Sequence, residues 1–327
     1  MSTNMTPATI AGMTMPAQVA ARGSLQHTLV TLVRREFWEH RALWVAPIAT
    51  AALLVVCTLF ARHVEIQGSD VGHGVFSARQ ALAVSTIAQA VVFMTLNLVA
   101  VLFVSFYLVD CLYAERRDRS IYFWKSMPVS DGLTVASKLL VAMVAVPLGV
   151  WALSAVTHVV ISLVFAVHAA LGHVPAQAIA WNTLTWLRVE FLLLIGIVLG
   201  VLWNAPISGY FLLVSALARR NAVMWAMGIP LLVPLIERIV LGSHYVWTFM
   251  AYRIQGIWDI LANHGDLNFI TGQAADNTHF NMPPIDALLG ELNFRAAFLA
   301  PDLWLGVIAA AAMVYAATRI RRYRDDT

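Results

Sequence analysis

Residues 115–138 read ERRDRSIYFWKSMPVSDGLTVASK and lie between two long apolar runs of the chain. This insert holds five of the 21 Lys and Arg residues. A charged insert between runs of membrane-spanning length cannot stay in hydrocarbon, so it must project into water. It is also patterned, because its basic cluster gives way to IYFW at 121–124 and then to Pro128 and a helix-start signal at Ser130-Asp131. We therefore expect a short amphipathic surface, carried on a membrane bundle, to which a soluble partner docks.

Composition places the rest of the chain in the membrane. Hydrophobic residues make up 60% of the 327 residues and charged residues only 12%, whereas soluble domains carry about 25% charged residues. This excludes an ordinary soluble protein. The basic residues form short clusters at the ends of apolar runs rather than a continuous stripe, so we expect no nucleic-acid partner. The chain opens with an uncharged stretch rich in Thr, Ala and Met, which lacks the pattern of a signal peptide, and residues 1–24 are predicted to form a disordered cytosolic tail.

Six segments are long and apolar enough to cross a bilayer as helices, namely 43–60, 81–109, 139–167, 187–217, 222–241 and 297–318. The sequence thus predicts an all-α polytopic membrane protein with one transmembrane domain at 25–318 and a basic cytosolic tail at 319–327. The second, third and fourth spans exceed the bilayer thickness, so we expect them to tilt or to continue as helix into water. A seventh span would arise if the fourth were split at Asn204-Ala205-Pro206. We favour six, on the expectation that neither half is long enough alone.

The distribution of basic residues predicts the orientation. Fifteen of the 21 lie at one set of span ends, together with the loop around Arg116, and six lie at the other. Both termini and that loop are therefore expected in the cytosol. The two cysteines, Cys57 and Cys111, then fall near opposite faces of the membrane, so we expect no disulfide between them.

Two further segments are expected to be helical. Residues 25–44 place apolar residues at helical spacing with charges between them, which predicts an amphipathic helix on the inner membrane surface. The alternative is a cytosolic extension of the first span. Residues 242–296 are too apolar for a solvated linker and predict short helices between spans five and six, at the outer membrane surface, followed by a polar section at 266–281 and a break at Pro283-Pro284.

Signatures of catalysis are missing from the sequence. It contains no G-x-x-x-x-G-K-[ST] phosphate loop, no H-E-x-x-H zinc motif, no C-x-x-C and no G-x-S-x-G. The run Glu36-Phe-Trp-Glu39-His40 lacks the first histidine of the zinc motif. We expect no catalytic residue, metal or cofactor in this chain.

Polar residues within the spans are few. Ser154, His158 and Ser162 form a stripe on one helix face, which indicates interhelical hydrogen bonding, the lining of a transport path or, least of all, a metal site. Acids and lysines are nearly absent at depth, which argues against ion-coupled transport, so the energy for any transport must come from elsewhere. The candidates for lining a path are Gln89, Asn97, His158 and Asn204.

Residues 29–56 and 115–140 together resemble the permease subunits of type-2 ABC exporters. In that family a cytosolic lead-in helix precedes the first span, and a loop between spans two and three carries an LP-x-S-[RD]…K pattern that docks on the ATPase. Here the pattern reads MPVSD at 127–131, followed by Lys138, with Met127 in place of the usual leucine. The six-span layout, the cytosolic termini and the apolar outer segment also match, so the resemblance covers nearly the whole chain.

The resemblance implies a multi-pass subunit of the bacterial inner membrane that moves an unidentified substrate, most simply outward. Its partners would be a cytosolic ABC ATPase, which binds ATP and Mg, and a second permease copy or homologue. The implied ATPase-docking residues are Arg116, Arg117, Tyr122, Phe123, Trp124, Lys125, Pro128, Ser130 and Asp131. Alternatively, these aromatics form an interfacial belt and the arginines only set the topology.

Two other functions remain open at this point. One is a membrane-embedded enzyme that uses His158, His168 or Ser208. The other is a non-transporting membrane anchor or sensor that recruits a cytosolic protein through the same loop.

Overall fold

The computed structural model describes residues 25–60, 78–126, 129–172, 181–261 and 293–323. Within these ranges every regular element is helical, and six helical segments are long and apolar enough to cross a membrane. This confirms the all-α polytopic fold. The six segments are α2 (Ala42–Phe60), the run Val84–Arg117 of α3, the continuous run Asp131–Ala170, α7 (Thr183–Trp203), α9 (Ala222–Leu241) and α13 (Pro301–Tyr323).

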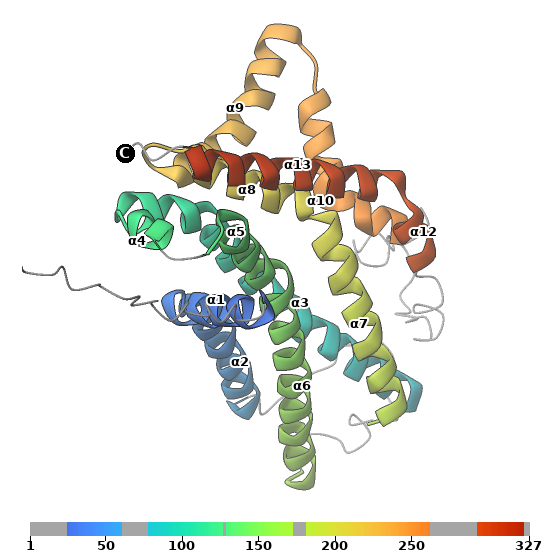
Figure 1. Ribbon diagram of the computed structural model, residues 1–327. Coiled ribbons are helices and arrows are strands. Elements are labelled where there is room, and N and C mark those ends of the chain that lie inside the picture. The colour runs from blue at the N-terminus through green and yellow to red at the C-terminus, as the bar shows by residue number, and fades with distance from the viewer. Residues whose placement is uncertain (1–24, 61–77, 127–128, 173–180, 262–292, 324–327) are drawn as a thin grey trace, which may run out of the picture.

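The lead-in segment forms a helix of its own. Helix α1 (Leu25–Glu39) ends before α2 begins, and it runs across the end of α2 instead of continuing its axis (Figure 1). An extension of the first span is therefore wrong, and a separate amphipathic helix is confirmed. Leu32 and Glu36 are buried on one side of α1, while Val30 and Trp38 are exposed on the other.

Helix α3 (Ala78–Arg117) carries the start of the charged insert as helix, and a short helix, α4 (Ile121–Ser126), follows it. Between them Arg119 takes a positive φ of 58°, which reverses the chain. Ser130 then caps α5 (Asp131–Leu140) by accepting a hydrogen bond from the Leu133 amide at 3.3 Å, so the predicted helix start is confirmed. A π-helical turn, η2 (Val141–Ala145), joins α5 to α6 (Val146–Ala170).

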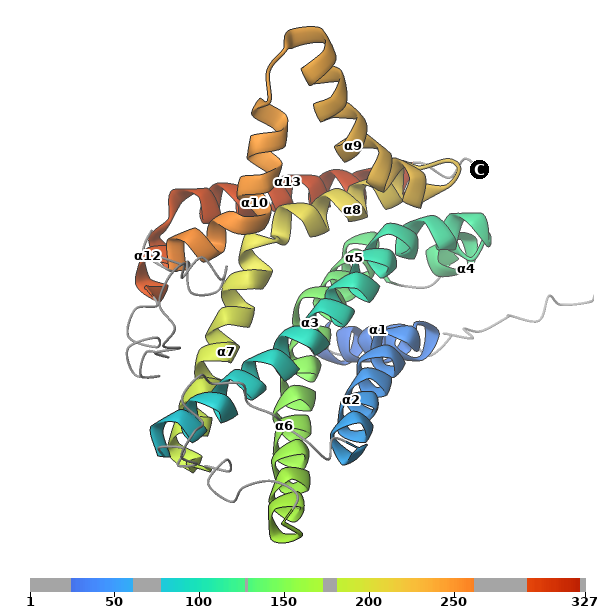
Figure 2. The same ribbon diagram turned by 180° about the vertical axis from the view of Figure 1, so that it is seen from behind.

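The predicted span 187–217 is wrong, because it is two helices. Helix α7 ends at Trp203, Asn204 turns the chain, and α8 (Ala205–Leu217) then runs alongside α13 (Figures 1 and 2). Pro206 cannot continue the hydrogen bonds of α7 because it has no amide hydrogen. Helix α7 has 21 residues and is long enough alone, contrary to our expectation, whereas α8 is a shorter apolar helix.

Helices α8 and α13 approach closely at a glycine. A Cβ added to Gly209 would lie 3.2 Å from the Ala310 backbone, so any other residue at this position requires the two helices to shift slightly apart. Helix α13 begins at Pro301 and not at 297, because the separate short helix α12 (Phe294–Leu299) precedes it. It also continues to Tyr323, so residues 319–323 extend the helix and are not part of a tail.

Between spans five and six the chain forms α10 (Tyr245–Leu261) and then α12, so short helices in this region are confirmed. Glu237, near the end of α9, accepts hydrogen bonds from the Tyr245 and Val246 amides, both at 2.8 Å, and so caps α10. The polar section 266–281 and Pro283-Pro284 lie outside the described residues.

The main core lies where α2, α3, the α5–α6 run and α8 meet, and it includes Leu96, Leu108, Val146 and Leu212. Many large apolar side chains elsewhere are exposed, as expected for surfaces that face lipid. Both cysteines are free.

Candidate functional site

Four helices converge on a cluster of charged side chains, four of them buried and two half-buried. The cluster takes residues from α1, from the ends of α3 and α13, and from α5. We name it the buried ion network, and it consists of Arg35, Glu36, Glu115, Asp131, Lys138 and Arg321. Its three acids oppose three bases, and Arg35 also pairs with Glu39 on α1, its closest carboxylate, at 2.7 Å.

Lys138 lies at the centre of this network. Its side chain is 1% exposed, and its Nζ lies 2.9 Å from Glu36 Oε1 and 3.2 Å from Glu115 Oε1. Lysine is almost never fully buried unless it is paired. Here one ammonium joins α5 to both α1 and α3.

Arg321 extends the network to the end of α13. Its Nη2 donates to Glu115 Oε2 at 2.8 Å, and its Nη1 donates to Asp131 at the start of α5. The Glu115 carboxylate therefore binds Lys138 through one oxygen and Arg321 through the other. Charge-assisted bonds of this kind are roughly twice as strong as neutral ones.

Glu36 is fixed from several sides. The Tyr107 hydroxyl donates to Glu36 Oε2 at 2.8 Å, and His40 Nε2 lies 3.7 Å from the same oxygen. Burial lowers the pKa of His40 below its ordinary value, and this effect outweighs the opposing attraction of Glu36.

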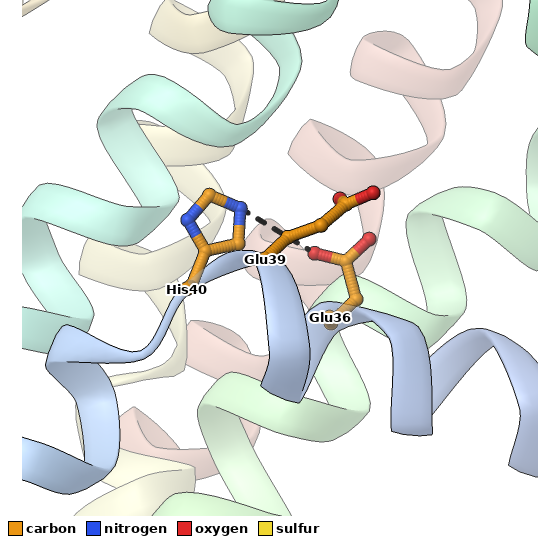
Figure 3. A group of neighbouring side chains, drawn as sticks. All are labelled: Glu36, Glu39 and His40. Atoms are coloured by element: carbon orange, nitrogen blue, oxygen red, sulfur yellow. Dashed lines mark ion pairs between the residues drawn. The ribbon is translucent and has the colours of Figure 1, made fainter.

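Glu36, Glu39 and His40 also lie close enough together to suggest a metal site (Figure 3). Their carboxylates are already occupied, however. Glu36 binds Lys138 and Tyr107, and Glu39 accepts two hydrogen bonds from Arg35, at 2.7 and 3.1 Å. A divalent cation would have to displace buried or bidentate partners, so the geometry favours ion pairing over metal binding at this group.

Three of the predicted docking residues lie on the surface beside this network. Tyr122 and Phe123 of α4 are 54% and 58% exposed. Arg117 is also exposed and pairs with Asp118 at 3.0 Å. These side chains can meet a partner without unfolding the helices that carry them.

Other predicted docking residues contact the chain itself. The guanidinium of Arg35 lies 3.3 Å from the ring centroid of Trp124, which ties α4 to α1. Arg116 donates to the Ser215 and Ala218 carbonyls at the end of α8, at 2.6 and 3.0 Å. The ammonium of Lys125 lies 3.4 Å from the Arg322 carbonyl oxygen, to which it donates.

Two of the motif residues that the family resemblance pointed to make contacts within the chain. Ser130 caps α5, and Asp131 belongs to the buried ion network. Pro128 lies outside the described residues. The last residue of the pattern, Lys138, is the centre of the network.

The predicted path-lining residues separate into two groups. Gln89 of α3 and His158 of α6 are both buried near the start of α7, where His158 stacks on Trp181 with ring centroids 6.1 Å apart. Asn97 is half-buried farther along α3, and Asn204 is exposed and donates to the Gly200 carbonyl at 2.8 Å. The structure therefore brings Gln89 and His158 into one region and places Asn204 at a helix end.

The polar stripe on α6 bonds partly within its own helix and partly to a neighbour. Ser154 donates to the Trp151 carbonyl and Ser162 to the His158 carbonyl, both at 2.8 Å. His158 hydrogen-bonds to the backbone of Ser85 on α3, so the favoured expectation of interhelical bonding is met by the histidine and not by the two serines.

Sequence reasoning missed Glu36, Glu115, Arg321 and Glu190 as members of sites. For Glu36 a signal was present, because it follows Leu29, Leu32 and Val33 at helical spacing and so lies on the apolar face of α1. For Arg321 the signal is weaker, because it lies in a run of basic residues that also reads as a tail.

Comparison with models of protein families, with curated proteins and with solved structures finds no match to this chain. Its function must therefore be inferred from its residues and their geometry.

Proposed function

We propose that this chain is the membrane-spanning permease subunit of a type-2 ABC exporter, driven by a separate cytosolic ATPase. The observation that carries the proposal is the placement of α4. This helix presents Tyr122 and Phe123 to solvent and lies directly against the buried ion network through Trp124 and Arg35. Exposed aromatic residues beside arginine are typical of interface hot spots.

The network gives a physical route for work delivered at α4. Charge-assisted bonds join α1, α3, α5 and α13, so a push on α4 displaces these helices together and not singly. Helix α5 is the first part of the candidate membrane span Asp131–Ala170, in which the π-helical turn η2 is followed directly by α6. This chain needs no covalent chemistry for such a role, because ATP and Mg act in the partner.

The direction and setting of transport belong to the same proposal. The basic span ends, which include the α4 region and the end of α13, face the cytosol of a bacterium, and the protein lies in its inner membrane. A second permease copy or homologue completes the transport path. The family resemblance supports outward transport of an unidentified substrate.

The test is co-purification from native membranes with an ATPase that carries a G-x-x-x-x-G-K-[ST] loop. We expect the wild-type chain to retain such an ATPase and the double variant Tyr122→Asp/Phe123→Asp to lose it. The matched control is Trp247→Asp/Phe249→Asp on α10, which changes two comparably exposed aromatic residues away from α4. The control should retain the ATPase.

Three outcomes would count against the proposal. If no such ATPase accompanies the wild-type chain, the permease role falls. If the ATPase is retained equally by the α4 variant and the control, docking through α4 is wrong. An ATPase that binds but hydrolyses no ATP in the reconstituted complex would favour the anchor or sensor.

A further inference from the structure

One face of helix α1 carries exposed basic and apolar side chains together. Val30, Arg34 and Trp38 follow one another four residues apart, so they lie on the same side of the helix. All three are exposed, and both Val30 and Trp38 reach 65%. Arg41, between the end of α1 and the start of α2, is exposed as well. We name these four residues the outer face of α1.

The two arginines of the outer face have no partner in the described part of the chain. There the side chains of Arg34 and Arg41 make no hydrogen bond, ion pair or ring contact. The two acids of α1 do not neutralise them, because Glu36 binds Lys138 and Glu39 binds Arg35. The outer face therefore keeps two uncompensated positive charges.

Contacts on the other sides of α1 fix the direction of this face. Phe37 stacks on Trp44 of α2, with ring centroids 4.2 Å apart and an angle of 12° between the rings. On the buried side, Glu36 binds Lys138 of α5. Helix α1 thus crosses the end of the first candidate span (Figure 1), and a helix in that position lies in the plane of the membrane at the level of the head groups. Its buried side is occupied by protein, so the outer face is left for the head-group region.

We propose that the outer face of α1 binds phospholipids with anionic head groups. The guanidinium groups of Arg34 and Arg41 each offer paired donors that match the oxygens of a phosphate. Trp38 lies between them in sequence, and tryptophan favours the boundary between head groups and acyl chains. Val30 extends the apolar part of the face. Such a ligand needs no cavity, because it is held along a surface.

Charge complementarity favours an anionic lipid over a zwitterionic one. A zwitterionic head group offers a phosphate but also brings a cation to a face that already carries two positive charges. The attraction of two arginines to an anionic membrane surface corresponds to an enrichment of roughly thirtyfold. Binding requires neither an ATPase nor a second subunit, so this inference stands apart from the proposed permease role.

The test is photocrosslinking from the outer face itself. The purified full chain carries the substitution Val30→p-benzoylphenylalanine and is placed in nanodiscs of equal parts phosphatidylglycerol and phosphatidylcholine. After irradiation, mass spectrometry counts the crosslinks to each lipid. We expect phosphatidylglycerol to be favoured roughly ten- to thirtyfold, and this preference should fall as the salt concentration rises.

Three variants in the same background separate the role of the two arginines from general effects. Arg34→Gln/Arg41→Gln removes both charges and should bring the preference close to parity, without a change in melting temperature because neither side chain bonds within the described chain. Arg34→Lys/Arg41→Lys keeps the charges and should retain most of the preference. The matched control is Arg219→Gln/Arg220→Gln, which changes an exposed pair between α8 and α9 and should leave the preference as it was.

Equal crosslinking to the two lipids before any arginine is changed overturns the proposal, and so does a preference that survives Arg34→Gln/Arg41→Gln. If no lipid is crosslinked at all, the outer face lies in water and the proposal is wrong. The same substitution at Val30 irradiated in native membranes tests the other occupant. Crosslinks there to a protein in place of lipid would assign the face to an acidic protein surface and overturn lipid binding.

Discussion

Replacing Lys138 with methionine tests the buried ion network most directly. Methionine has nearly the length of lysine but no charge, so the substitution leaves packing almost unchanged. The ammonium of Lys138 lies within 3.2 Å of two carboxylates, and its side chain is 1% exposed. Without it, Glu36 retains only Arg35, 3.9 Å away, as a close cation, while Glu115 keeps Arg321.

We expect Lys138→Met to lower the free energy of unfolding by about 3–5 kcal/mol, the usual cost of removing one partner of a buried ion pair. The assay is the fraction of monodisperse protein that remains in mild detergent after heating. The matched control is Lys125→Met, which changes the only other lysine of the chain. Its ammonium makes a longer, exposed hydrogen bond of 3.4 Å, so its effect should stay below about 1 kcal/mol.

A double-mutant cycle separates the ion pair from general damage. Lys138→Met combined with Glu36→Gln should be less destabilised than the sum of the two single changes, by at least about 1 kcal/mol, because the second change removes a carboxylate that the first left unpaired. Additive effects, or a melting temperature for Lys138→Met equal to that of Lys125→Met, would refute the reasoning.

Two other predictions concern single positions. A Cβ at residue 306 would overlap the guanidinium of Arg253, which Trp203 and the Asp302 carbonyl hold in place, so Gly306→Ala should lower the free energy of unfolding by about 1–3 kcal/mol. The control is Gly196→Ala on α7, where a Cβ meets nothing within 4 Å, and it should be neutral or stabilising. Equal effects of the two changes on the melting temperature would contradict this packing. Burial lowers the pKa of His40 in the folded protein below 6.5, its ordinary value. The unfolded chain therefore binds the proton first as the pH falls, so the free energy of unfolding should keep its full His40 contribution above pH 6.5 and lose it below. His40→Gln should make the melting temperature less dependent on pH between pH 7.5 and 5, and an unchanged dependence would argue against a role for His40.

The sequence predicted the parts of the fold that depend on local composition. Long apolar runs located five of the six candidate spans, while the run 187–217 merged the fourth span, α7, with the separate helix α8. Ser130-Asp131 marked a helix start that the structure confirms. A split at Asn204 was not favoured because neither half was expected to be long enough alone, and α7 proves long enough. Hydropathy measures the free energy of transfer of a segment and not the direction of its axis, so it does not show such a turn. Pro206 was the residue that marked the turn.

The candidate site was less predictable because its members pair over long distances in sequence. Asp131 and Arg321 are 190 residues apart, and Gln89 and Glu190 are 101 apart. Pattern reasoning assigned the charges of the insert to a solvated docking face. The structure shows that both side chains instead pair within the chain. Lys138 pairs with Glu36 and Glu115, and Asp131 pairs with Arg321 at the end of α13.

The helical run Asp131–Ala170 contacts both the buried ion network and the region around Glu190. Near its beginning, Lys138 is held by α1 and α3. Thirteen residues later, Trp151 donates through Nε1 to the Glu190 carbonyl at 3.1 Å. Lys138 and Trp151 are therefore separated by about 20 Å along the helix. The π-helical turn η2 lies between them. A single rod with one interruption thus connects the surface beside α4 to the buried part of α7 around Glu190, and the length over which any motion must be relayed is set by this helix alone.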